Sequence, residues 1–269
     1  MIRTPYFFNS DASSEVLASF FDTQGYLVFP NFFDPETLDA LNTELHQHFA
    51  AILGNALGAA RSRDEAKTFD CDVIPWDPVA EDNRLFRRVH ADDRMNALTA
   101  KVLGDGFGVG SSLVMYSVGG GKGQAWHQDC PSEATDAFNL NRLIYTEDVS
   151  AKDGALVFVP GSHRLGVIPP GGHQDTMADE VMLCPTAGTL ALLHGHVFHR
   201  VTPNLNQRPR VSANFRAYPA GIDPSVNCIG VYRNGSVNFC DQPKRHDGTP
   251  AEGVSQIADS TARHHSAAT

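Results

Sequence analysis

The segment Ala125-Trp126-His127-Gln128-Asp129-Cys130 is the most informative part of this 269-residue chain. On a β-strand, the side chains of His127 and Asp129 project from the same side of the pleat. Two imidazoles and one carboxylate on one face of an octahedral ion are the ligand set of non-haem Fe(II) oxygenases, which leaves three coordination positions open. The segment therefore predicts two of the three ligands of a metal site built on a β framework.

The third ligand must come from a distant part of the chain, and His199 is the candidate. It lies seventy residues after Asp129 and eleven residues before Arg210. His194 and His196 are close by, but on a regular strand these two share one face while His199 points to the other. We therefore expect His199 to bind the metal, with His194 or His196 as the alternative.

From about residue 106 the chain consists of short β-like runs separated by turn residues. Strands at this spacing predict an antiparallel sandwich or barrel. The separator Gly119–Gly123 is rich in glycine, but its position between strands indicates a bend and not a phosphate-binding loop. The expected strands are Gly110–Ser117, Ala125–Cys130, Leu140–Glu147, Ala155–Val159, Val181–Leu183, Thr189–Leu193, Val197–Val201 and Arg210–Tyr218.

The first hundred residues are predicted to be mostly helical, with one short strand at Gly25–Pro30. Asp34 followed by Pro35 is typical of a helix start, because aspartate caps and proline fits the first turn. Residues 67–88 are expected to include a loop that could cover a site. We expect one domain over 1–240, with a helical part at 1–105 and a β-core at about 106–220. The polar tail 241–269 is expected to be flexible. The apolar face of the helix would consist of Leu38, Leu41, Leu45 and Phe49.

Charge and cysteine usage narrow the class of protein. The formal net charge is −10, which argues against non-specific binding to nucleic acid or to anionic membranes. No apolar run reaches eighteen residues, and the N-terminus lacks a secretory signal, so neither a membrane span nor export is expected. The five cysteines are scattered, which favours free thiols in a reducing compartment, and hence the cytoplasm. Cys130 either lies near the metal or fills the core.

Four ordered motifs resemble the phytanoyl-CoA dioxygenase-like (PhyH) family of Fe(II)/2-oxoglutarate-dependent oxygenases. They are Trp126–Asp129, Asp153–Arg164, Gly188–His199 and Arg208-Pro209-Arg210, and the resemblance spans about residues 15–220. It implies a mainly β fold with flanking helices, the cupin-like double-stranded β-helix or jelly roll. His163 falls within the second motif, where the preceding Pro-Gly pair favours a structural role at a turn.

The resemblance also implies the roles of individual residues. His127, Asp129 and His199 would act catalytically through the iron, and Arg210 would bind the distal carboxylate of the cosubstrate 2-oxoglutarate. A guanidinium suits this task because its planar fork matches a carboxylate with two hydrogen bonds. The alternative for Arg210 is a structural salt bridge. Further cosubstrate-binding candidates are Gln124, Asn141 and Ser212; Ser212 and Asn214 would share the strand face of Arg210.

The implied reaction consumes O₂ and 2-oxoglutarate, releases succinate and CO₂, and oxidises an unactivated C–H bond. Halogenating relatives replace the metal-binding acid with a small residue, so Asp129 favours hydroxylation. The acidic balance favours a small polar or specialised biosynthetic metabolite over a CoA thioester. Whether the protein is a monomer or a homodimer is open. Candidate substrate-binding residues are Tyr116, Trp126, Asn139, Trp76 and Arg88.

Two other functions remain compatible with the sequence. The first is a jelly-roll metalloenzyme that uses the same three ligands without 2-oxoglutarate. The second is a non-catalytic β-sandwich binding module. Arg210 and a requirement for the cosubstrate separate the first alternative from the oxygenase, while metal affinity and O₂ consumption test the second.

Overall fold

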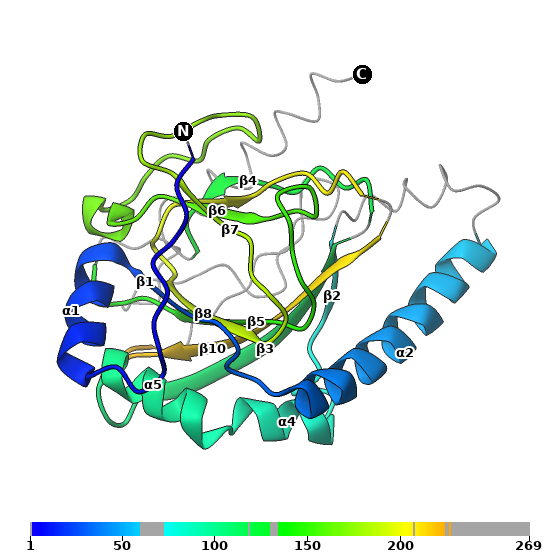
Figure 1. Ribbon diagram of the computed structural model, residues 1–269, viewed down its shortest axis with the longest axis horizontal. Helices are drawn as coiled ribbons and strands as arrows, with labels where there is room; N and C mark the ends of the chain where they lie inside the picture. Colours follow the sequence, from blue (N-terminus) through cyan, green and yellow to red (C-terminus); the bar gives the residue numbers. More distant parts are fainter. Residues whose placement is uncertain are drawn as a thin grey trace.

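The computed structural model describes residues 2–59, 73–117, 119–129, 134–206, 208–223 and 226 (Figure 1). The expected flexible tail, Cys130 and part of the expected covering loop lie outside these residues. Among the described residues, no helix is long and apolar enough to cross a membrane.

Two antiparallel β-sheets lie one above the other and form the jelly roll that the sequence predicted (Figure 1). The smaller sheet has the order β4-β9-β6-β7 and the larger sheet the order β1-β8-β5-β10-β3-β2. The smaller sheet contains β4 (Gln124–His127), β6 (Leu156–Phe158), β7 (Val181–Leu183) and β9 (His199–Val201). The larger contains β1 (Tyr26–Phe29), β2 (Val73–Trp76), β3 (Gly108–Ser117), β5 (Leu140–Tyr145), β8 (Thr189–His194) and β10 (Arg210–Tyr218).

Strand β2 corrects one expectation. Residues 67–76 were expected to be loop, but Val73–Trp76 pairs with β3 at the edge of the larger sheet. The sequence is too short and too irregular there for its pattern to show a strand. What holds Val73–Trp76 in place is the backbone pairing with a partner some forty residues away.

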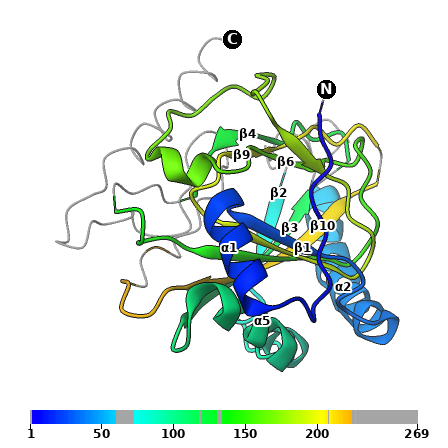
Figure 2. The same ribbon diagram turned by 60° about the vertical axis from the view of Figure 1, so that its left-hand side comes forward.

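The α-helices cover the outer face of the larger sheet (Figure 2). The predicted helix start is confirmed, because Asp34 Oδ1 accepts a hydrogen bond from the Thr37 backbone N–H at 2.8 Å. The predicted apolar face, from Leu38 to Phe49, is buried in the core against this sheet. The helices are α1 (Ser14–Gln24), α2 (Pro35–Ala59), α4 (Arg84–His90), α5 (Asp93–Leu103) and the short 3₁₀ helix η1 (Ser162–Leu165).

Strand β10 has one apolar face and one polar face. Val211, Ala213 and Phe215 pack among the apolar residues under the helices. The intervening polar residues point the other way, into a cavity between the two sheets, because successive strand residues face opposite sides. Strand β10 thereby presents polar side chains toward the smaller sheet, where the predicted metal ligands lie. These inward-facing residues are Arg210, Ser212, Asn214 and Arg216.

Candidate metal centre and active site

His127, Asp129 and His199 meet at one edge of the cavity. Strands β4 and β9 are neighbours, and their register places His127 opposite His199. The backbone N–H of Asp129 donates to Gly195 O at 2.7 Å, which holds the carboxylate beside the two rings. One ligand atom from each side chain lies within 4.8 Å of the others. In the described part of the chain, this is the one group of three that could hold a metal ion.

The backbone orients both imidazoles. His127 Nδ1 lies 2.7 Å from Ala125 O, and His199 Nδ1 lies 2.8 Å from Val197 O. A carbonyl only accepts, so Nδ1 is the protonated nitrogen in each ring and Nε2 is left with its lone pair for a metal. Burial, together with the neighbouring His199, lowers the pKa of His127 to about 4. The ring is therefore neutral at pH 7, as metal binding requires.

The carboxylate of Asp129 is held by two donors from the larger sheet. Asn141 Nδ2 donates to Asp129 Oδ2 at 2.7 Å, and Arg216 Nη2 donates to the same oxygen at 3.0 Å. Burial alone would raise the pKa of this carboxyl, but Arg216, the two histidines and the amide hold it well below its ordinary value. Asp129 is therefore an anion at any pH at which the protein is expected to work.

Arg210 lies in the same cavity and has no carboxylate partner among the described residues. It is 6% exposed, donates through Nη1 to Ser212 Oγ at 2.7 Å, and leaves Nε without a partner. Burial lowers the pKa of Arg210, while Tyr145 opposes that shift. A buried guanidinium without an anion is costly. No salt bridge therefore accounts for Arg210 in the described structure, and its free donor suits an incoming carboxylate.

The cavity between the sheets measures about 60 Å³. Of the predicted residues, it brings together the three metal ligands with Gln124, Asn141, Arg210 and Ser212. Tyr145 and Arg216 also line it and were not among the predicted residues. Period-two alternation, continued from Asn141 along β5 and from Arg210 along β10, would have indicated both. The apolar part of the wall consists of Leu113, Met115, Leu143, Leu156, Leu193 and Val201.

Trp126 does not line the cavity, contrary to expectation. As the immediate neighbour of His127 on a strand, it projects from the opposite face. Its ring stacks on Phe198, with centroids 5.2 Å apart, and its Nε1–H donates to Asp175 O at 2.8 Å. The indole is fully buried, so its contacts are those of a core residue.

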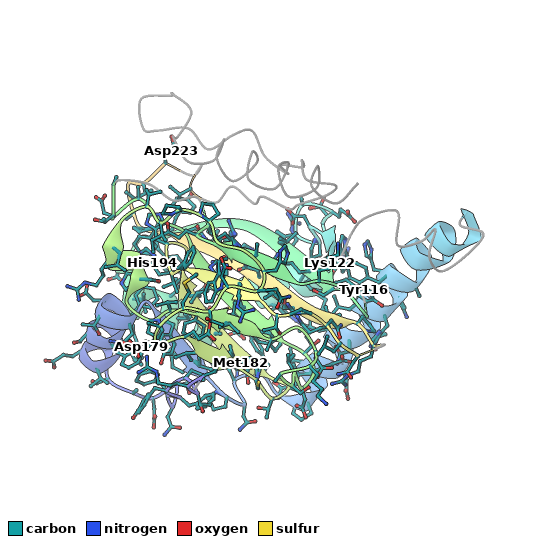
Figure 3. The ribbon with its side chains drawn as sticks, turned by 90° about the horizontal axis from the view of Figure 1, so that it is seen from above. Tyr116, Lys122, Asp179, Met182, His194 and Asp223 are labelled. Atoms are coloured by element: carbon teal, nitrogen blue, oxygen red, sulfur yellow. The ribbon has the colours of Figure 1, made fainter. Side chains whose placement is uncertain are left out.

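Three further substrate candidates lie on the helix side of the larger sheet. Tyr116 stacks on Phe49 of α2 at 4.4 Å, and Figure 3 places it toward that helix. Trp76 stacks on His48 of α2 at 3.8 Å. Arg88 is exposed on α4, which covers the outer face. Strand parity and helix position direct these side chains away from the cavity, so they do not line it as expected.

Asn139, the fifth substrate candidate, lies behind the cavity wall. It is fully buried, and its Nδ2 donates to Asn141 Oδ1 at 3.2 Å. Its contact with the metal site is therefore indirect, through Asn141.

The competing histidines form a separate buried group with His163. His194 Nδ1 accepts the backbone N–H of His196 at 3.0 Å, and the ring stacks on Phe138 at 3.7 Å. His163 Nε2 donates to Asp22 O at 2.9 Å, which agrees with a structural role. In Figure 3, His194 lies toward α1. The structure therefore brings His199, and neither His194 nor His196, to Asp129.

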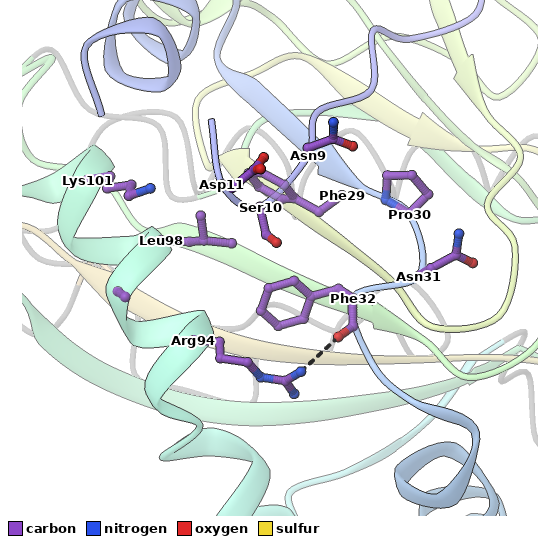
Figure 4. Close-up of a pocket in the computed structure, with 11 residues that line it drawn as sticks. Asn9, Ser10, Asp11, Phe29, Pro30, Asn31, Phe32, Arg94, Leu98 and Lys101 are labelled. Carbon is purple, nitrogen blue, oxygen red and sulfur yellow. Dashed lines mark hydrogen bonds between the residues drawn. The ribbon is translucent and has the colours of Figure 1, made fainter. Parts of the chain in front are cut away.

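A second hollow, of about 530 Å³, lies outside the larger sheet between the N-terminal segment and α5 (Figure 4). Its two cations already have partners, since Arg94 donates to Phe32 O at 3.2 Å and Lys101 donates to Ala12 O at 3.0 Å. The described residues around it form no metal-binding group. The candidate active site is therefore the cavity between the sheets, which contains the metal-binding group.

The chain is similar in sequence to known proteins. The family model of phytanoyl-CoA dioxygenase (PhyH) matches residues 21–212. An ectoine dioxygenase of Halomonas elongata is 28% identical over 248 residues, covering 79% of this chain and 73% of the relative. Dioxygenase hkm4 of Aspergillus hancockii is 24% identical over 208 residues, covering 72% and 67%.

Solved structures share the fold at low identity. HygX from Streptomyces hygroscopicus, with nickel and 2-oxoglutarate bound, superposes with a TM-score of 0.60 at 16% identity, covering 78% of this chain and 88% of HygX. SnoN, a non-heme alpha ketoglutarate dependent epimerase from nogalamycin biosynthesis, gives a TM-score of 0.55 at 19% identity, covering 89% and 95%.

Proposed function

Because the chain belongs to the phytanoyl-CoA dioxygenase family, we propose that it is an Fe(II)- and 2-oxoglutarate-dependent dioxygenase that oxidises a C–H bond of a small molecule. One observation supports placing the binding sites for iron and 2-oxoglutarate in the cavity between the sheets. A complete two-histidine, one-carboxylate group lines the same small space as a buried arginine that has no carboxylate partner among the described residues. The first suits iron and the second suits the distal carboxylate of 2-oxoglutarate.

The residues present fit both groups. His127 Nε2, His199 Nε2 and Asp129 Oδ1 would hold Fe(II), and Arg210 with Ser212 would hold the distal carboxylate. Bound Fe(II) supplies the redox chemistry that couples decarboxylation of 2-oxoglutarate by O₂ to oxidation of the substrate. For a hydroxylation, R–H, 2-oxoglutarate and O₂ give R–OH, succinate and CO₂.

The other lining residues set the conditions of that reaction. The apolar side chains of both sheets exclude bulk water, which strengthens the interactions of the charged groups. Tyr145 lies beside Arg210 and keeps its proton, because burial raises its pKa. It is therefore a hydrogen-bond donor available to the cosubstrate carboxylate. The presence of Asp129 favours oxidation over halogenation, because the carboxylate fills the position that a halide would need.

The substrate is proposed by class alone. The acidic surface favours a small polar or specialised metabolite over a CoA thioester, and the named relatives are an ectoine dioxygenase and dioxygenase hkm4. We expect a biosynthetic hydroxylase that works in the cytoplasm.

The test is an anaerobic titration of the Fe(II)-loaded protein with 2-oxoglutarate, following the weak visible charge-transfer band of the chelate. The wild type should develop the band, and Arg210→Ala should need about 100-fold more 2-oxoglutarate, because a buried charged hydrogen bond is lost. Arg200→Ala is the matched control, since Arg200 is also a buried arginine but donates to His173 O outside the cavity. A protein that binds iron but develops no band contradicts the proposal and favours a metalloenzyme without 2-oxoglutarate.

A further inference from the structure

Two donors from different strands converge on one oxygen of the metal-binding carboxylate. Asn141 comes from β5 and Arg216 from β10, and both reach Asp129 Oδ2, at 2.7 Å and 3.0 Å. The other oxygen, Oδ1, is the one that faces His127, 3.8 Å from its Nε2. The carboxylate thus has an outer oxygen directed to the larger sheet and an inner oxygen directed to the histidines.

The hydrogen bonds behind Asn141 fix which way its amide points. Asn141 Oδ1 accepts from Asn214 Nδ2 at 2.7 Å and from Asn139 Nδ2 at 3.2 Å. Asn214 Oδ1 in turn accepts the backbone N–H of Arg142 at 3.2 Å, which orients Asn214. Because the oxygen of Asn141 is occupied on one side, its NH₂ group is the end that faces Asp129. The amide is therefore set as a donor to the carboxylate before any metal arrives.

We propose that Arg216 and Asn141 are positioning residues that hold the outer oxygen of Asp129 and so present only the inner oxygen to the metal. This inference rests on the proposed function. A carboxylate can bind a metal through one oxygen or through both. With both oxygens bound, Asp129 would take a fourth coordination position. Only two would then remain, although 2-oxoglutarate needs two and O₂ needs a third.

The two arginines of the cavity differ in their anionic partners, and this difference supports the proposal. Arg216 is 4% exposed and forms its ion pair with Asp129 at 3.0 Å. Arg210, six residues earlier on the same face of β10, has no carboxylate partner in the described structure. Arg216 therefore neutralises a resident anion, and Arg210 is left for an incoming one.

The test removes the Asp129 carboxylate and measures whether Arg216 and Asn141 bind a small carboxylate in its place. In Asp129→Gly, Arg216 and Asn141 still point into the vacated space, so added formate should bind there and complete the coordination of Co(II). The visible absorption of Co(II) reports this step without oxygen, 2-oxoglutarate or turnover. In Asp129→Gly/Arg216→Met the formate concentration for half-saturation should rise at least tenfold, because a charge-assisted hydrogen bond is lost.

The matched control is Asp129→Gly/Arg210→Met, which removes the other cavity arginine. Its formate response should equal that of Asp129→Gly, whereas 2-oxoglutarate binding should be lost. Equal formate affinity with and without Arg216 overturns the proposal. A failure of 2-oxoglutarate to bind any variant or the wild type, with the formate difference intact, counts instead against the proposed function.

A variant that retains Asp129 keeps the proposal decidable if Asp129→Gly does not bind Co(II). Arg216→Met/Asn141→Leu removes both donors to the outer oxygen, and its crystal structure with Co(II) should show both carboxylate oxygens on the metal. Arg216→Lys/Asn141→Leu should restore binding through one oxygen, since an ammonium also donates to the outer oxygen. A carboxylate that stays bound through one oxygen in Arg216→Met/Asn141→Leu overturns the proposal.

Discussion

Two groups of buried histidines lie in the same fold, and they differ in what surrounds the second nitrogen of each ring. In the metal group, His127 and His199 each donate Nδ1–H to a backbone carbonyl, and their remaining nitrogens converge on Asp129. In the second group, His163 donates to Asp22 O and His194 accepts a backbone N–H. No described carboxylate completes a metal-binding set there. Burial and proximity are common to both groups, and only convergence on an anion distinguishes a metal site.

The largest expected effect tests this distinction directly. His199→Ala should weaken Co(II) binding by more than about 100-fold, because loss of a ligand exceeds the 10- to 100-fold effect of losing an outer partner. His163→Gln is the control from the second group, since glutamine retains a donor for Asp22 O. Its Co(II) affinity, measured by calorimetry, should stay within about threefold of the wild type, which corresponds to under 1 kcal/mol. A strong loss of affinity in His163→Gln would show that the two groups are not functionally distinct.

Part of the metal group could be predicted because its geometry is local: His127 ends β4, and Asp129 follows two residues later with its carboxylate near the same ligand atoms. His194 ends β8 and His199 begins β9 in the other sheet, so the choice of His199 over the alternatives His194 and His196 depends on the fold and not on parity along one strand. Parity along Arg210–Tyr218 also predicted that Ser212 and Asn214 would face inward with Arg210. The same alternation, continued by one step, places Arg216 on the inward face as well.

The substrate candidates that lie outside the cavity have two different causes. Alternation along the strand already places Trp126 on the face opposite His127. The side to which Tyr116 points depends instead on which face of β3 meets the helices. That choice is made by the pairing of β3 with β10 and β2, which no local pattern reveals. The role of Asn141 has the same origin. An isolated amide in an apolar strand indicates a buried partner, but only the fold identifies this partner as Asp129.

Gly195 contacts both histidine groups, so a substitution at this position should affect both of them. It lies between His194 and His196, and its carbonyl accepts the backbone N–H of Asp129 at 2.7 Å. A Cβ atom at this position would overlap Asn139. Gly195→Ala should therefore reduce the free energy of unfolding by about 1–3 kcal/mol, as overpacked sites do, and displace the segment that holds Asp129.

Two measurements on Gly195→Ala separate these effects. Urea unfolding reports the stability, and Co(II) titration reports the metal site, where we expect a loss of affinity of about tenfold. A destabilised protein with unchanged Co(II) affinity would show that the turn supports the second histidine group alone.

A further expected effect concerns acid stability. Burial, together with His196 and His163, lowers the pKa of His194 to about 2, and burial also lowers the pKa of His163. The charged groups near His163 are Asp22, which opposes its shift, and Arg164, which adds to it. In the unfolded chain these imidazoles titrate near pH 6.5. Below that pH the unfolded state binds more protons than the folded state, so stability is complete above about pH 6.5 and decreases as the pH falls.

For His194 alone, the decrease between pH 7 and pH 5 is on the order of 2 kcal/mol. Urea midpoints of the metal-free protein at the two pH values measure it. His194→Phe keeps the stacking on Phe138 and removes the titrating group, so it should be less stable than the wild type at pH 7 but lose less stability at pH 5. Equal losses in the two proteins would mean that the second histidine group takes up its protons without unfolding. Burial would then not be what keeps His194 neutral, and the contrast with the metal group would rest on geometry alone.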